Sequence, residues 1–113
     1  MGKKHLHILW TNDNPITAEK MVFMYAVNSL MHGWWEEITL IVWGATAKLV
    51  SEDSNLQQKI REAIDAGVRI TACRACADQL GVVDALLSLG IEVKNWGQPL
   101  TEILQKNSPL LTV

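Results

Sequence analysis

The hydrophobic and polar positions along the chain predict strands that alternate with helices. Apolar runs rich in β-branched and aromatic residues and bounded by turn residues predict strands; they cover residues 5–10, 37–43, 68–72 and 91–94, with 110–113 as a terminal edge strand. Helices are expected over residues 15–32, 45–51 and 54–66, over 73–90 with an interruption near Gly81, and after Pro99. Such alternation with short links is typical of an α/β domain whose parallel sheet is covered on both faces.

Local signals support these boundaries and the extent of the domain. Asn14 is suited to cap the first long helix, with Pro15 at its first position, and Ser54 and Gln57 have the spacing of a capping box. A chain of 113 residues has the length of one ordinary domain, so we predict a single α/β domain over residues 1–113. Its sheet is expected to be mainly parallel, with four or five strands in the order 2-1-3-4 and the first strand central.

The carboxyl edge of the predicted sheet carries the candidate site. Ligands and reactive groups collect beyond the carboxyl ends of parallel strands, and Cys73 and Cys76 follow the third strand there. Cys73 is expected at a helix N-terminus, where free amides and the helix dipole stabilise a thiolate. The predicted crevice around the cysteines is bordered by Asn12, Asp13, Gly44, Arg74 and Trp96.

The cysteine pair has three other possible interpretations. Free cysteines often serve as small buried hydrophobes, but C-x-x-C at the start of a helix after a strand favours chemistry. The surroundings of the pair do not resemble the thioredoxin motif. Zinc needs four ligands. His5 and His7 are expected at the opposite edge of the sheet, about 15–20 Å from the cysteines. His32, at the far end of its helix, is also expected on that side. We therefore expect neither a metal nor a cofactor.

Composition and charge restrict the class of protein. Apolar residues make up 49% of the chain and charged residues 19%, which excludes a disordered protein. The net charge of −2 shows no basic excess typical of binding to nucleic acid or to an anionic membrane. No secretory signal and no apolar run of membrane-spanning length is found. Two close cysteines without a disulfide framework suit a reducing compartment, so we expect a cytoplasmic protein.

The segment 73–82, Cys-Arg-Ala-Cys-Ala-Asp-Gln-Leu-Gly-Val, resembles the cysteine motif of the DsrE/DsrF-like family. In that motif a cysteine lies eight residues before a glycine that a small aliphatic residue follows, often with a second cysteine three positions after the first. The similarity extends over nearly the whole chain, including the polar turn after the first strand and Trp43-Gly44-Ala45 after the second.

The resemblance implies a three-layer Rossmann-like domain that assembles into trimers or hexamers. It also implies that Cys73 accepts sulfur as a persulfide and that Cys76 is the accessory thiol, with proteins as sulfur donor and acceptor. Thiol–disulfide chemistry by the same pair is compatible with the motif. A second hypothesis from another class remains: a non-catalytic oligomeric module that binds a small ligand or a protein in the crevice, with both cysteines buried and inert.

The first long helix independently indicates self-association. Residues 21–27 are apolar on every side of the helix. A helix of this kind is buried on all sides, and one sheet covers only one of them. We therefore expect a homo-oligomer, at least a dimer, with Phe23 and Met24 buried between subunits.

Overall fold

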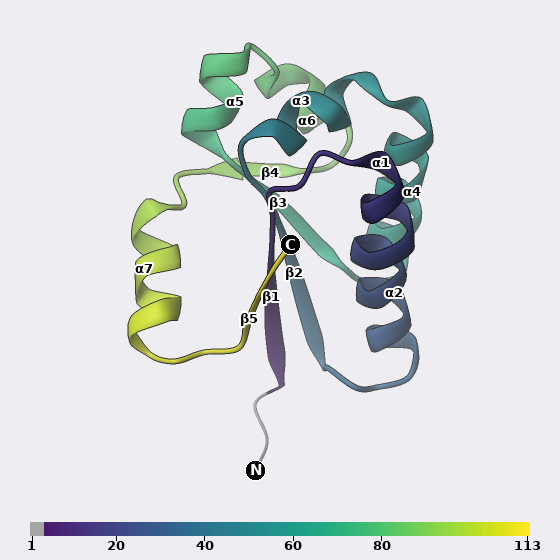
Figure 1. Cartoon of the computed structure of the whole chain (residues 1–113), viewed down its shortest axis with the longest axis vertical. Coiled ribbons are helices and arrows are strands. Elements are labelled where there is room, and N and C mark those ends of the chain that lie inside the picture. The colour runs from purple at the N-terminus through teal and green to yellow at the C-terminus, as the bar shows by residue number, and fades with distance from the viewer. Residues whose placement is uncertain (1–3) are drawn as a thin grey trace.

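The domain is built on a parallel sheet of five strands (Figure 1). The structure is a computed structural model that describes residues 4–113, so the first three residues of the predicted domain lie outside the described residues. The strands are β1 (His5–Trp10), β2 (Glu37–Val42), β3 (Arg69–Cys73), β4 (Glu92–Lys94) and β5 (Leu110–Thr112). The prediction of a mainly parallel sheet of four or five strands is confirmed.

The helices lie close to the predicted ranges. They are α1 (Pro15–Thr17), the π-helical η1 (Ala18–Phe23), α2 (Met24–Met31), α3 (Ala45–Glu52), α4 (Ser54–Asp65), α5 (Arg74–Leu80), α6 (Val83–Ser88) and α7 (Gly97–Gln105). Asn14 caps α1 as predicted, because its side chain accepts hydrogen bonds from the amides of Ile16 and Thr17. Asp53 rather than Ser54 caps α4, through a hydrogen bond from the Leu56 amide. No helix within residues 4–113 has the length and apolarity needed to cross a membrane.

The predicted strand order was wrong. The observed order is β4-β3-β2-β1-β5, so that β2 and not β1 occupies the centre of the sheet. Each of the strands β2, β3 and β4 lies next to the strand before it, always on the same side. Only the connection from β4 to β5 crosses back, and it places β5 on the other side of β1. Because crossover connections are right-handed, connections that add strands in one direction place their helices on one face of the sheet. A connection in the opposite direction places its helix on the other face. The connection from β4 to β5 therefore puts α7 alone on the second face.

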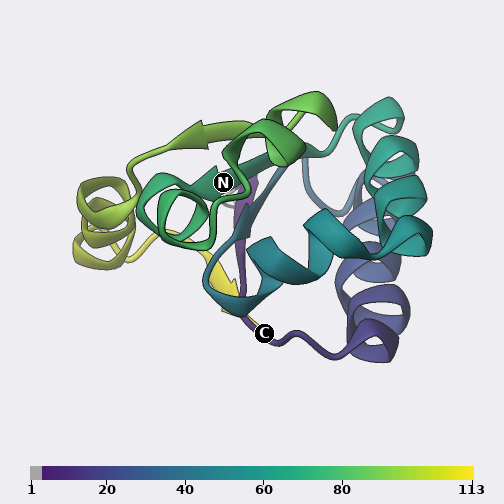
Figure 2. The same cartoon turned by 90° about the horizontal axis from the view of Figure 1, so that it is seen from above.

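Figures 1 and 2 show the resulting three layers. Helices α1, η1, α2 and α4 cover one face, α7 lies against the other, and α3, α5 and α6 gather at the carboxyl ends of the strands. The main core lies under the larger helical layer, where alternate residues of β1 (Leu6, Ile8 and Trp10) are buried. A smaller cluster of Ile41, Trp96 and Ile103 lies beside α7.

Phe23 belongs to the main core. Its ring packs edge-on against Trp10, with ring centroids 5.4 Å apart, and only 3% of the residue is exposed. Phe23 therefore needs no second subunit to cover it, contrary to the expectation that it lies between subunits. Met24, the next residue, is 49% exposed and remains available for such a contact.

Candidate functional site

The ends of β1 and β2 are tied together at the carboxyl edge of the sheet by Thr46, a residue of α3. Its hydroxyl donates to the carbonyl of Trp10 and accepts from the amide of Trp43, at 2.9 and 3.0 Å. Thr46 is fully buried. This bridge fixes the turn at Gly44, whose φ of 71° lies in the region that favours glycine. This bridge was not predictable from the sequence pattern.

A cavity of about 530 Å³ opens at this edge, between the turn after β1 and helices α3 and α5. It is lined by Asp13, Gly44, Ala45, Lys48, Leu49, Glu52, Cys76, Gln79 and Leu80. Two members of the predicted crevice, Asp13 and Gly44, are therefore brought together with Cys76. Clefts of this volume accommodate a small ligand or an inserted side chain.

The two cysteines occupy different positions relative to this cavity. Cys76, in the first turn of α5, is half-buried and lines the cavity wall. Cys73 is the last residue of β3 and the N-cap of α5, is 6% exposed, and does not line the cavity. A crevice around both cysteines was predicted; of the two, only Cys76 lines the cavity.

The surroundings of Cys76 favour its protonated thiol. Burial is the main cause of its raised pKa, and a hydrogen bond with the Cys73 side chain raises the pKa further. The backbone of Gly44 opposes both effects through a hydrogen bond that lowers the pKa of Cys76. The two thiols are thus within hydrogen-bonding reach of each other, and the Gly44 turn supplies a group that stabilises charge on the Cys76 sulfur.

Alkylation of Cys76 by iodoacetamide is expected to follow this raised pKa. The thiolate is the reacting species, so the rate should increase with pH and reach its midpoint above the about 8.5 of a free thiol. Cys73→Ala removes the hydrogen bond that favours the protonated form and should move the midpoint to lower pH. Rates measured on the native protein by mass spectrometry test this, with Arg74→Gln as the control that should leave the midpoint unchanged.

Three of the predicted crevice residues do not line the cavity. Arg74 is exposed and pairs with Asp78, whose carboxylate lies 3.7 Å from its Nε. Asn12 accepts a hydrogen bond from the Asn14 amide within the exposed turn after β1. Trp96 lies on the α7 face, where its Nε1 donates to Thr71 Oγ1 at 3.0 Å. Trp96 therefore does not line the cavity of Cys76.

Two charged residues of α3 that the sequence did not place in the predicted crevice also line the cavity. Lys48 and Glu52 are four residues apart, which places both on one side of the helix, and both line the cavity. Their position after the Gly44 turn could have indicated this, because a helix that begins at the carboxyl edge of the sheet turns one of its sides toward that edge. Within residues 4–113 no group of three or more histidines, cysteines and carboxylates is arranged to hold a metal ion.

The fold and the site together define a three-layer α/β domain with a dithiol at the carboxyl edge of its sheet. The sequence model of the DsrE/DsrF-like family matches residues 4–111. The chain therefore belongs to the DsrE/DsrF-like family.

Two solved structures are similar to this chain over nearly its full length. One is the conserved protein of unknown function BT1422 from Bacteroides thetaiotaomicron, with 43% sequence identity, a TM-score of 0.95, and coverage of 97% of this chain and 95% of that one. The other is the ychN protein from E. coli, with 14% identity, a TM-score of 0.71, and coverage of 99% and 100%. The second likeness concerns the fold alone. No curated protein matches the chain.

Proposed function

We propose that this protein is a sulfur carrier that uses Cys73 and Cys76 as a pair. The observation that carries the proposal is the interaction between the two thiols, of which Cys76 lines a cavity and Cys73 is buried. Membership of the DsrE/DsrF-like family supports a role in sulfur relay. Sulfur enters from the cavity and is stored, as a persulfide, on the less accessible cysteine.

The first step is transfer of sulfur to Cys76. Its thiolate attacks the outer sulfur of a donor persulfide, the donor's S–S bond breaks, and the donor leaves as a thiolate. A new S–S bond makes Cys76 a persulfide, and no net oxidation occurs. The Gly44 backbone, which already favours charge on this sulfur, stabilises the attacking thiolate.

The second step moves the sulfur to Cys73. The Cys73 thiolate attacks the outer sulfur of the Cys76 persulfide, and Cys76 is released as a thiolate. The interaction between the two side chains, which raises the pKa of Cys76, supports this exchange. At 6% exposure, Cys73 keeps its persulfide away from solvent and competing thiols. This order differs from the one that the resemblance implies, because Cys76 accepts the sulfur first and Cys73 then stores it.

The donor and acceptor are proposed to be proteins that present a thiol at the cavity. The exposed side chains of Asp13, Lys48 and Glu52 surround the opening and supply both signs of charge for docking. Both cysteines are free thiols, which suits work in the reducing cytoplasm.

Intact-mass measurement after incubation with a persulfide donor tests the proposal. The wild-type protein should gain about 32 Da, the mass of one sulfur atom, through persulfide formation. The Cys73→Ser/Cys76→Ser double variant should gain none. Equal gains by the two proteins would show that sulfur adds elsewhere and would refute the proposed function.

The burial of Cys73 favours a second candidate, a ligand-binding module with inert cysteines. In that case a ligand occupies the cavity of about 530 Å³ and neither thiol reacts in the native protein. Thiol labelling separates the two candidates. Labelling of Cys76 under native conditions supports the carrier, whereas two thiols that react only after unfolding support the binding module.

We further propose that the protein self-associates through a patch formed by Met24, Met31 and Trp34. These side chains are 49%, 70% and 58% exposed and lie on α2 and the turn after it. Exposed apolar side chains grouped in this way mark contact surfaces. Because Phe23 is buried in the core, we propose this patch as the interface in place of the whole of residues 21–27.

Met24→Asp is expected to shift the protein toward the monomer. A carboxylate buried at the interface loses hydration without gaining a partner, so the association constant should fall by about tenfold or more, since 1.4 kcal/mol suffices for that change. Light scattering at micromolar concentration checks this. Leu87→Asp, at a residue of α6 that is 52% exposed, is the control that should leave the oligomer intact. A wild-type protein that is already monomeric would contradict the proposal.

A further inference from the structure

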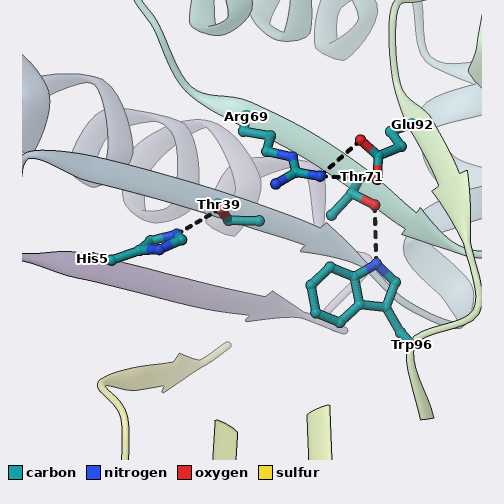
Figure 3. A network of polar contacts seen from close by, with 6 residues as sticks. All are labelled: His5, Thr39, Arg69, Thr71, Glu92 and Trp96. Atoms are coloured by element: carbon teal, nitrogen blue, oxygen red, sulfur yellow. Dashed lines mark hydrogen bonds and ion pairs between the residues drawn. The ribbon is translucent and has the colours of Figure 1, made fainter. Parts of the chain in front are cut away.

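The α7 face of the sheet carries a group of polar side chains that the sulfur site does not use. Alternate residues of β1, β2 and β3 point to this face, and they include His5, His7, Thr39, Arg69 and Thr71. Figure 3 shows the resulting contacts: His5 Nε2 lies 2.7 Å from Thr39 Oγ1, and Arg69 pairs with Glu92 of β4. Such a concentration of polar groups on an interior face of a parallel sheet is unusual, because these faces are normally apolar.

A cavity of about 270 Å³ lies between this face and α7. Its sheet side is formed by His7, Thr39 and Arg69. Lys94 and Trp96, at the end of β4, close one wall. It shares no lining residue with the cavity of Cys76, so the two sites are separate.

Positive charge predominates around this second cavity. Glu102 of α7 and Lys106, which directly follows that helix, line it together with Arg69 and Lys94, which gives three cationic groups and one carboxylate. Arg69 is already paired, because its Nη2 donates to both carboxylate oxygens of Glu92 at 2.9 and 3.0 Å. Lys94 and Lys106 form no ion pair with another residue of the described chain. With Arg69 paired to Glu92, the two lysines outnumber the one carboxylate of Glu102, so the cavity has a surplus of positive charge.

The basic wall of the cavity is held in position by its neighbours. Trp96 is fixed by its hydrogen bond to Thr71, drawn in Figure 3. Lys94 Nζ lies over the Trp96 ring, 4.7 Å from its centroid, a favourable cation–π distance. The ion pair with Glu92 holds the Arg69 guanidinium in the same way. These contacts reduce the entropy that a ligand would otherwise lose in ordering flexible basic side chains.

His7 supplies an unused hydrogen-bonding group beside these cations. Its Nδ1 is buried and has no hydrogen-bond partner among the described residues, and buried polar atoms normally have one. Burial is the main cause that lowers the pKa of His7 to about 4, with further lowering by the charges of His5, Arg69 and Lys94 and a smaller opposing effect of Glu37. His7 is therefore neutral near pH 7, so its ring carries one N–H donor and one acceptor nitrogen.

We propose that this cavity binds a small dianionic oxyanion of the sulfate or phosphate type. Lys94 and Lys106 supply charge that no ion pair engages, and Arg69 adds donors from the sheet. The hydroxyls of Thr39 and Ser108, which also line the cavity, suit the oxygen atoms of such a ligand. The cavity volume restricts the ligand to one with few atoms, and the excess of cations disfavours a metal ion.

Sulfate is the suitable probe, because it remains a dianion over the whole pH range in which His7 titrates. Sodium sulfate is added to the wild-type protein at constant ionic strength maintained with sodium chloride, and the histidine ring signals are followed by NMR. We expect saturable shifts of the His7 signals. The bound dianion favours the imidazolium, so the pKa of His7 should increase by about one unit, which corresponds to about tenfold tighter binding to the protonated form.

Matched variants distinguish a site from general screening by salt. Lys94→Gln and Lys106→Gln should each weaken sulfate binding by about tenfold, because each removes one charge-assisted contact. Lys48→Gln removes an exposed lysine on the cysteine side of the molecule and should leave binding unchanged. Linear, non-saturating shifts, equal shifts with chloride alone, or equal affinity in all three variants would each overturn the proposal.

Discussion

Cys73→Ser and Cys76→Ser are expected to fail at different steps of sulfur loading. Cys73→Ser keeps the thiol that lines the cavity, so it should take up sulfur at a rate close to that of the wild type. It should then lose the sulfur rapidly, because the persulfide stays at the cavity wall, where thiols can attack it. Cys76→Ser keeps only the buried thiol and should load about tenfold or more slowly, since access controls exchange, but retain what it receives.

Time courses of intact mass after addition and removal of the donor distinguish these two defects. Arg74→Gln serves as the control, because this exposed side chain lies between the cysteines in sequence but outside the cavity. Loading of Cys76→Ser at the wild-type rate would show that donors reach Cys73 directly. Rapid loss of sulfur from both single variants and from the wild type alike would contradict storage on Cys73.

Trp10→Ala should cause the largest loss of stability. Trp10 is fully buried, packs on Phe23, and donates from Nε1 to the carbonyl of Asn12 at 2.9 Å. Replacing a buried tryptophan by alanine leaves a cavity and costs about 3–5 kcal/mol of the free energy of unfolding. Urea denaturation followed by circular dichroism measures this loss, and the variant should also disorder the turn that carries Asp13.

A milder substitution covers the case in which Trp10→Ala does not fold. Ile8→Val removes one methylene group from a fully buried side chain of the same strand and should cost about 0.5–1.5 kcal/mol. Leu104→Ala, at a position of α7 that is 57% exposed, should change the free energy of unfolding by less than about 0.5 kcal/mol. Equal losses for Ile8→Val and Leu104→Ala would contradict the assignment of the core.

The sequence predicted the elements of the fold better than their arrangement. Apolar runs and turn residues located all five strands, and Asn14 and Gly81 marked helix ends correctly. The order of the strands was not predictable from these signals, because an alternating pattern does not say on which side each new strand joins the sheet. One signal was present in β1, where polar His5 and His7 alternate with buried Leu6 and Ile8. This alternation indicates that one face of the strand is less deeply covered.

The candidate site was predicted in outline and wrong in some of its members. The C-x-x-C spacing and the rule for parallel sheets correctly brought Cys76, Asp13 and Gly44 to one edge. Trp96 does not line that cavity, and its Nε1 instead donates to Thr71. The different exposure of Cys73 and Cys76 could not be predicted from the sequence either, because it depends on how α3 packs beside α5.

Locating the added sulfur at the peptide level tests the central claim most directly. Trypsin cleaves after Arg69 and Arg74, so Cys73 and Cys76 fall on separate peptides. After loading, blocking with iodoacetamide and digestion, we expect the extra mass of about 32 Da, one persulfide sulfur, first on the Cys76 peptide and later on the Cys73 peptide. Absence of added sulfur from both peptides at every time point would contradict the account.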